Sequence, residues 1–147
     1  MLNISVQEFE EILRDESGNP DVDFINVCTP AEYQAEHIAG VRNVPLDTIF
    51  GAVDDLRTKK AVYVHCRSGR RSAKAIETLQ SLGVHADLIN VDGGLMAWGQ
   101  HQANKSSDET PEAAPGRLQK TPLMILLVPA IISFIIITLV ALLFLRH

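Results

Sequence analysis

The strongest constraint on folding lies near the end of the chain, where residues 122–145 read PLMILLVPAIISFIIITLVALLFL without a charged residue. At about 1.5 Å per residue this stretch forms a helix of roughly 36 Å, and the hydrocarbon core of a bilayer is about 30 Å thick. A small soluble domain cannot surround a helix of this length that is apolar on every side. We therefore expect one transmembrane helix over 122–145, in which Pro129 produces a tolerated kink.

Charges beside this stretch give its expected orientation. Lys105, Arg117 and Lys120 precede it, and Arg146 follows it. Because basic residues are retained on the cytoplasmic side, this small bias places the N-terminal domain in the cytoplasm. The first residues show no basic and apolar leader, which agrees with that placement. The simplest location is the inner membrane of a bacterium, with membrane lipid around 122–145.

Residues 102–121, QANKSSDETPEAAPGRLQKT, are polar, contain two prolines and show no apolar period. This composition predicts a flexible linker, and as a coil it spans about 25 Å on average. The formal net charge of the chain is −5, and it is −6 for residues 1–121 because Arg146 is the only charged residue beyond them. An acidic domain lacks the basic face that nucleic-acid binding needs, so we expect no nucleic-acid partner.

Residues 1–101 alternate between strand-like and helix-like segments. This alternation predicts an α/β domain, in which helices cover both faces of a parallel sheet. Capping boxes at 5–8 and 29–32 predict two helix starts, and apolar runs at 22–27, 61–64 and 88–91 predict strands, with further helices from Ser72 and Leu95.

The most informative segment joins the strand at 61–64 to the helix from Ser72 through Cys66. Ligands bind outside the carboxyl ends of parallel strands. A short loop containing Gly69 can turn its backbone N–H groups toward the sulfur, and the next helix adds the positive end of its dipole. Arg67, Arg70 and Arg71 add positive charge. All of these favour the thiolate, which is the nucleophilic form of cysteine.

The other cysteine, Cys28, lies far from Cys66 in the sequence, and the chain has neither a CxxC motif nor a Cys/His cluster. We therefore expect no metal and no cofactor. His37 is interpreted as a structural hydrogen-bonding residue and His65 as a strand-end residue, because a thiolate that is stabilised by its loop needs no base.

Three ordered motifs carry a family resemblance. The loop 66–72, Cys-Arg-Ser-Gly-Arg-Arg-Ser, resembles the active-site loop of the rhodanese family. The stretches 24–33 and 36–46 resemble the first signature of that family, and 92–98 resembles its closing turn. The resemblance covers roughly residues 3–100 and implies a rhodanese-like fold.

This resemblance also implies a chemistry. The thiolate of Cys66 would attack the outer sulfur of thiosulfate or of a protein persulfide, and Cys66 would then carry a persulfide. The terminal sulfur would pass to a thiophilic acceptor such as cyanide or a thiol. Within the loop that includes Ser68 and Gly69, Arg67 and Arg70 are candidates for binding an anionic donor. Arg71 would help to hold the shape and charge of the loop.

Loop length separates this chemistry from that of related phosphatases and arsenate reductases, in which five residues separate cysteine and arginine. Here four residues separate Cys66 from Arg71. The shorter loop makes a smaller cradle, which is suited to a sulfur atom rather than to a tetrahedral phosphate.

The chain departs from the family pattern at three positions. Asn26 and Cys28 stand where aspartate and arginine are usual, and Ala39 stands where proline is usual. One hypothesis is that Cys28 resolves a persulfide or an oxidised Cys66 by forming a disulfide. The simpler interpretation is a small apolar core residue. The departures also leave open a second class of function, a rhodanese fold retained for docking or redox sensing with little turnover.

Overall fold

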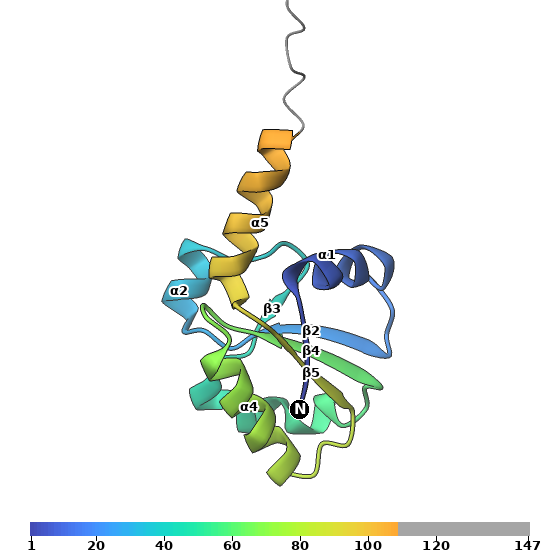
Figure 1. The fold of residues 1–147 in the computed structure, drawn as a ribbon. Coiled ribbons are helices and arrows are strands. Elements are labelled where there is room, and N and C mark those ends of the chain that lie inside the picture. The colour runs from blue at the N-terminus through green and yellow to red at the C-terminus, as the bar shows by residue number, and fades with distance from the viewer. Residues whose placement is uncertain (109–147) are drawn as a thin grey trace, which may run out of the picture. The chain divides into compact units, whose positions relative to one another are not determined.

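The computed structural model describes residues 1–108, which are built on a five-stranded parallel sheet (Figure 1). The strands are β1 (Leu2–Ile4), β2 (Val22–Asn26), β3 (Arg42–Asn43), β4 (Ala61–His65) and β5 (Asp87–Val91), in the order β1-β5-β4-β2-β3. The helices are α1 (Val6–Asp15), α2 (Pro30–Ala35), the 3-10 helix η1 (Leu46–Ala52), α3 (Val53–Leu56), α4 (Arg70–Ser81) and α5 (Gly94–Asp108). The α/β prediction with a parallel sheet is confirmed.

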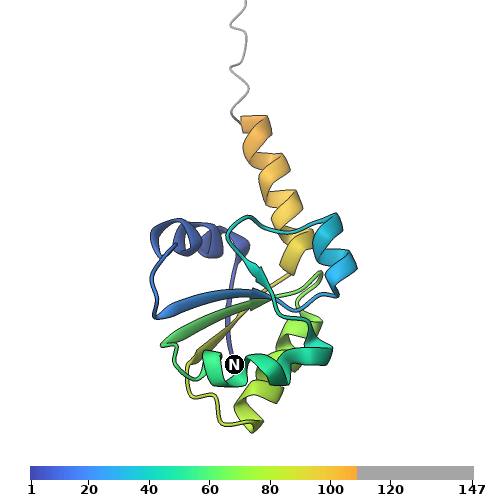
Figure 2. The same ribbon diagram turned by 180° about the vertical axis from the view of Figure 1, so that it is seen from behind.

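The helices form a layer on each face of the sheet. Both views place α1, α2 and α5 on one side, and α4, η1 and α3 on the other (Figures 1 and 2). The central strand β4 is therefore covered on both faces, and Val62 and Val64 are fully buried. Burial on both faces explains why β4 reads as an almost continuous apolar run rather than as an alternating one.

Both predicted capping boxes are present. The hydroxyl of Ser5 accepts the N–H of Glu8, and the Glu8 carboxylate in turn accepts the N–H of Ser5. Thr29 and Glu32 make the same reciprocal pair at the start of α2, where Pro30 occupies the first turn. Since each box satisfies amide groups that the helix leaves unpaired, the two helix starts are fixed locally by sequence.

Helix α5 extends further than the sequence pattern indicated. It runs to Asp108, so residues 102–108, which were predicted to begin a flexible linker, are helical. The reason is a long-range cluster on α1: the carboxylate of Glu10 accepts hydrogen bonds from Gln102 and Lys105 and pairs with His101. Leu95 and Trp98 pack the first half of α5 against the core, and these polar contacts hold its second half to α1.

The remaining segments of the predicted organisation lie beyond this part of the chain. The rest of the expected linker and the expected transmembrane helix at 122–145 lie outside the described residues. Within residues 1–108, no helix is long and apolar enough to cross a bilayer.

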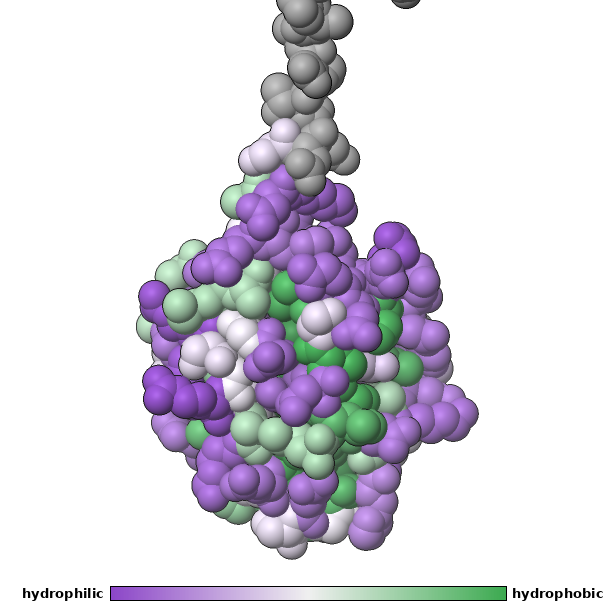
Figure 3. Space-filling view, viewed as in Figure 1, coloured by the Kyte–Doolittle hydropathy of each residue, from purple (hydrophilic) through white to green (hydrophobic). Residues whose placement is uncertain are grey.

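Some apolar side chains remain on the surface. Figure 3 shows hydrophobic residues among hydrophilic ones on one face of the domain. The large exposed hydrophobic side chains among the described residues are Met1, Leu2, Phe50 and Met96. Leu2 belongs to the edge strand β1, whose three residues make it too short to offer an extended pairing edge to another chain.

The start of α5 approaches β4 very closely, and Gly94 permits that approach. A Cβ atom at Gly94 would lie 2.1 Å from the carbonyl oxygen of Cys66, and the residue has φ +52°. Any other L-residue would both strain the backbone and displace the segment that follows β4.

We predict that Gly94→Ala lowers the free energy of unfolding by more than about 1 kcal/mol, because alanine fits neither the backbone angle nor the space. Urea denaturation followed by circular dichroism measures this change. Gly99→Ala is the matched control on the same helix: nothing lies within 4 Å of its added Cβ, and helix propensity makes it stabilising by up to about 1 kcal/mol. Equal stability of Gly94→Ala and wild type would contradict the proposed close contact.

Candidate functional site

Cys66 stands at the carboxyl edge of the sheet, immediately after β4. The ladder between β2 and β4 pairs Asn26 with His65, and the N–H of Val27 donates to the carbonyl of His65 at 2.9 Å. Cys66 follows directly and its side chain is fully buried. The central strand thus delivers the sulfur to the edge where parallel α/β sheets bind ligands.

The loop after Cys66 curls its polar groups around the sulfur. The N–H of Gly69 donates to the Cys66 Sγ at 3.2 Å, and the hydroxyl oxygen of Ser72 lies 3.6 Å from the same atom. Gly69 has φ +88°, an angle that glycine adopts without strain. It also precedes α4 directly, so the first turn of that helix faces the sulfur. Arg70, expected in the loop, is the first residue of α4.

This environment lowers the pKa of the Cys66 thiol. Burial is the largest single influence and acts in the opposite direction, because it raises the pKa. Hydrogen bonds from the backbone N–H groups of Ser72, Ser68 and Arg71, together with the Ser72 hydroxyl, outweigh it. The balance favours the thiolate, as expected for a sulfur that is surrounded by amide donors.

A chain of polar side chains supports Ser72 from beneath the loop. Its hydroxyl lies 2.6 Å from the Oδ1 of Asn90 and 2.9 Å from the carbonyl of Gly69, and Asn90 donates to Asn3 at 3.0 Å. The network thereby connects the loop to β5 and β1. Sequence reasoning missed Asn90, although an asparagine inside an otherwise apolar strand was the available signal.

The start of α5 holds the loop from a second direction. The N–H of Leu95 donates to the carbonyl of Cys66 at 2.9 Å, and that of Met96 donates to the carbonyl of Arg67 at 3.0 Å. These two N–H groups belong to the first turn of α5, and the N–H groups of a first helical turn have no acceptor within their own helix. The loop can therefore point its N–H groups inward at the sulfur because its carbonyls are satisfied from outside.

The three predicted arginines have different roles. Arg71 forms a bidentate ion pair with Glu32, at 2.7 and 2.8 Å, and this pairing raises the pKa of its guanidinium. Arg67 and Arg70 are exposed, and among the described residues neither guanidinium group has a hydrogen-bond or ion-pair partner. One arginine is thus committed to structure, and two remain available to bind anions.

Glu32 is a site residue that sequence reasoning saw only as a helix cap. Its carboxylate binds both the Thr29 hydroxyl and backbone, and the guanidinium of Arg71. The hydrogen bond from Arg71 is the main cause of a pKa of about 2 for Glu32. The carboxylate therefore stays charged over the whole neutral range and fixes α2 to the first turn of α4.

Cys28 lies beside the same arginine. Its Sγ is 3.5 Å from the Nη2 of Arg71, and its backbone N–H donates to the Oδ1 of Asn26 at 2.7 Å. The side chain is buried, and burial is the main cause of a raised pKa for its thiol. Both cysteines are free thiols in the structure. The strand end where charged residues are usual in the family is thus braced by Asn26 and by the Arg71–Glu32 pair.

The two histidines near the site are placed as interpreted. His37 contacts the carbonyl of Tyr33 at 2.9 Å and stacks on its ring. His65 is fully buried, and burial lowers its pKa to about 4, which leaves the imidazole neutral at physiological pH. Within residues 1–108, no group of three or more histidine, cysteine, aspartate or glutamate side chains is arranged to hold a metal ion.

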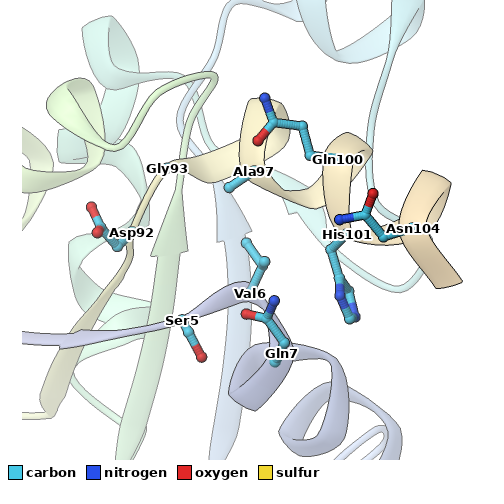
Figure 4. A pocket seen from close by; sticks show the side chains of 9 residues that line it. All are labelled: Ser5, Val6, Gln7, Asp92, Gly93, Ala97, Gln100, His101 and Asn104. Atoms are coloured by element: carbon cyan, nitrogen blue, oxygen red, sulfur yellow. The ribbon is translucent and has the colours of Figure 1, made fainter.

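Two pockets lie near this edge of the domain. The smaller, of about 110 Å³, adjoins the loop and is lined by Cys28, Glu32, Ala35, Glu36, Arg67 and Leu95. The larger, of about 290 Å³, lies between the start of α1 and one side of α5 (Figure 4). None of the predicted site residues lines the larger pocket, whereas Cys28 and Arg67 line the smaller one.

Comparison with known proteins agrees with this geometry. The family model described as a rhodanese-like domain matches residues 7–101. The uncharacterised protein YqhL of Bacillus subtilis is 35% identical over 83 residues, which cover 56% of this chain and 65% of that protein. A sulfurtransferase of Allochromatium vinosum is 31% identical over 81 residues, which cover 55% of this chain and 75% of that protein. Thiosulfate sulfurtransferase PspE of Escherichia coli is 39% identical over 64 residues, which cover 41% of this chain and 60% of that protein.

The relatives share one region with this chain rather than their full length. Across the matched curated proteins, the aligned region spans between 42% and 75% of each relative. Among solved structures, a rhodanese-like domain protein from Staphylococcus aureus superposes with a TM-score of 0.58 at 31% identity, over 67% of this chain and 92% of that one. The motif match, the sheet order and the cradle around Cys66 lead to one conclusion: the chain belongs to the rhodanese-like domain family.

Proposed function

We propose that this protein is a membrane-tethered sulfurtransferase that moves sulfane sulfur through a persulfide on Cys66. The observation that carries the proposal is the cradle itself: a cysteine with a lowered pKa accepts the N–H of Gly69 at 3.2 Å, beside two arginines whose guanidinium groups have no partner among the described residues. Relatives that are named as sulfurtransferases support the same class of reaction.

In the first step the Cys66 thiolate attacks the outer sulfur of a donor such as thiosulfate or a protein persulfide. With thiosulfate, a bond forms between Cys66 Sγ and the outer sulfur, the bond inside thiosulfate breaks, and sulfite leaves with its electron pair. The product persulfide is anionic, so the N–H groups that stabilise the thiolate also stabilise it. No base is required, which agrees with the neutral His65 at the strand end.

In the second step a thiophilic acceptor attacks the terminal sulfur. Cyanide takes the sulfur as thiocyanate, or a thiol takes it as a new persulfide, and the Cys66 thiolate is regenerated. Its lowered pKa also makes it a good leaving group in this step. The same cradle therefore assists both half-reactions.

The exposed charges at the rim favour anionic donors. Arg67 and Arg70 stand on either side of Gly69 and are free to bind the oxygens of a thiosulfate-like group, whereas Arg71 is held by Glu32. Guanidinium groups bind oxyanions through charge-assisted, often bidentate hydrogen bonds. The division of roles predicts that donor binding depends on the first two arginines, and loop stability on the third.

A second candidate function is a docking or redox-sensing module with little turnover. The observation that favours it is the complete burial of Cys66, together with a second buried thiol, Cys28, where the family usually has arginine. Such a module would keep the fold and the sulfur chemistry of the loop but would not cycle. Turnover distinguishes it from the enzyme.

The membrane tether remains part of the proposal. Its support is the uncharged apolar stretch at 122–145, preceded by Lys105, Arg117 and Lys120. A single span would keep the domain near the cytoplasmic face of a bacterial inner membrane.

For the chemistry, we predict that the full-length chain releases one equivalent of sulfite from thiosulfate before any acceptor is added. Cys66→Ser should release none, and thiocyanate formation with cyanide should fall at least about 10³-fold, as for other lost nucleophiles. Ion chromatography of sulfite and a colorimetric assay of thiocyanate measure the two half-reactions. Sulfite release without turnover would favour the docking or sensor module; absence of both would refute the sulfurtransferase.

For pH dependence, we predict that Cys66 alkylation by iodoacetamide is governed by a pKa below the ordinary thiol value of about 8.5. Because the folded-state pKa is lowered, the thiolate and its reactivity persist below the pH at which an ordinary thiol becomes protonated, and are lost only as pH falls through the lowered pKa. The Cys28→Ser variant isolates Cys66, and Cys66→Ser isolates Cys28, whose profile should lie above the ordinary value. Identical profiles for the two thiols would contradict the cradle.

For the tether, we predict that the full-length chain stays in the membrane fraction of expressing bacteria after alkaline carbonate washing. A variant with Ile132→Arg and Ile136→Arg keeps the chain length but costs about 2.5–3.5 kcal/mol per arginine at the centre of a span, so it should move to the soluble fraction. Immunoblotting of both fractions decides the matter, and release of the unmodified chain by carbonate would exclude the span.

A further inference from the structure

The hydroxyl of Ser72 has one proton and three neighbours that can accept it. Its Oγ lies 2.6 Å from the Oδ1 of Asn90, 2.9 Å from the carbonyl oxygen of Gly69 and 3.6 Å from the Sγ of Cys66. The Gly69 carbonyl already accepts the N–H of Ala73 at 3.2 Å. The competition for the proton therefore lies between the amide oxygen of Asn90 and the sulfur, and the short O···O distance assigns it to Asn90 in the structure.

Ionisation of Cys66 changes this competition. An anionic sulfur is a strong hydrogen-bond acceptor. If the hydroxyl proton turns toward it, the oxygens of Ser72 and Asn90 remain 2.6 Å apart with no proton between them. Both side chains are buried, so bulk water does not supply the missing donor, and an unsatisfied buried acceptor is costly. The contact becomes favourable again when the carboxamide of Asn90 turns over and places its N–H₂ group against Ser72.

The neighbouring side chain of Asn3 permits that turn. Asn90 pairs with Asn3 across the β1–β5 ladder, and its Nδ2 donates to the Oδ1 of Asn3 at 3.0 Å. Asn3 is exposed, and among the described residues its side chain has no other hydrogen-bond partner. Its carboxamide can therefore turn together with that of Asn90 and donate to the turned oxygen. Because each turn only exchanges the ends of a planar group, neither needs additional space.

We propose that Asn90 is a positioning residue that directs the Ser72 hydroxyl to one of two acceptors by turning over its carboxamide in concert with that of Asn3. In the thiol state, Ser72 donates to Asn90. In the thiolate and persulfide states, Asn90 donates to Ser72 and Ser72 donates to the sulfur. This inference rests on the proposed function, because those anionic states of Cys66 are the ones that carry sulfur.

The charged and titratable groups around Cys66 are separate from this amide pair. They are His65 at the end of β4, the thiol of Cys28, Arg71 with its partner Glu32, Asp92 beside Gly69, and the exposed Arg67 and Arg70. Among the described residues, none of them forms a hydrogen bond or ion pair with the side chains of Ser72, Asn90 or Asn3. All of them can therefore stay unchanged while the orientation of the amide pair is altered from β1.

Asn3→Asp tests the inference by locking the amide pair. A carboxylate only accepts hydrogen bonds, so it holds the N–H₂ group of Asn90 toward β1 and the Oδ1 toward Ser72. The thiolate then loses the Ser72 proton. We expect the pKa of the Cys66 thiol in the full-length chain to rise by about 1 pH unit relative to wild type, the effect of one lost hydrogen bond to a charged group. The pH dependence of iodoacetamide alkylation, with the Cys66 peptide quantified by mass spectrometry, gives this pKa.

Two variants of the same strand are the matched controls. Asn3→Ser keeps a group that both donates and accepts, so Asn90 can still turn and the pKa of Cys66 should stay at its wild-type value. Leu2→Asp adds the same charge at an exposed position whose ladder partner is Ile89 rather than Asn90. It measures the effect of charge alone, which salt at about 0.15 M keeps small.

The outcomes separate this inference from the proposed function. A pKa of Cys66 in Asn3→Asp that equals that of wild type or of Leu2→Asp would overturn the inference, because the amide pair would then have no effect beyond charge. An equal rise in Asn3→Ser would overturn it too, because the loss of the amide would then be the cause. The alkylation profile needs no sulfur donor. Failure of the wild-type chain to release sulfite from thiosulfate therefore counts against the sulfurtransferase, and the profile decides the role of Asn90 by itself.

Discussion

The organisation of the site depends on one constraint: a buried sulfur must carry negative charge. Removing a thiolate from water is costly, and the structure offsets that cost with backbone N–H groups rather than with a neighbouring cation. One of these donors is the amide of Gly69, which lies 3.2 Å from the sulfur. Because amides that point inward leave carbonyls that point outward, the loop needs hydrogen-bond donors from elsewhere to satisfy those carbonyls. The first turn of α5 supplies them by donating to the carbonyls of Cys66 and Arg67.

This arrangement explains why a glycine is required at position 94, beside the loop that carries Cys66. Gly94 has no Cβ, and only that absence lets the amides of α5 reach the carbonyl of Cys66. The Arg71–Glu32 pair secures the opposite side of the loop. The nucleophile is thus positioned by elements from three distant parts of the chain, while Arg67 and Arg70 are left to face the solvent and its anions.

Much of the fold follows from local patterns in the sequence. The capping boxes at Ser5 and Thr29 and the apolar run of β4 fix element starts by short-range rules, and the comparisons confirm the family that the three motifs indicated. The contacts that sequence reasoning missed are long-range. Glu32 and Arg71 are 39 residues apart in the sequence. The capping box already gave Glu32 a local role, so nothing in the sequence indicated a second partner.

Long-range polar contacts also explain the two other differences between the sequence-based expectations and the structure. Asn90 reads as a polar interruption of a strand until the fold brings it against Ser72. Residues 102–108 show no apolar period, and their helix is held by Glu10, more than 90 residues away. Polar partners of this kind leave no periodic signal in the sequence.

The Glu10 cluster has a mechanical consequence. Helix α5 carries the loop contacts at its first turn, and the chain continues from its last residue, Asp108. A pulling force on the chain beyond Asp108 therefore travels down α5 toward the amides that fix Cys66. His101, Gln102 and Lys105 lie between those two points, and all three are fastened to Glu10 on α1. Part of a force on α5 therefore passes through these contacts to α1 and does not reach the amides that contact the Cys66 segment.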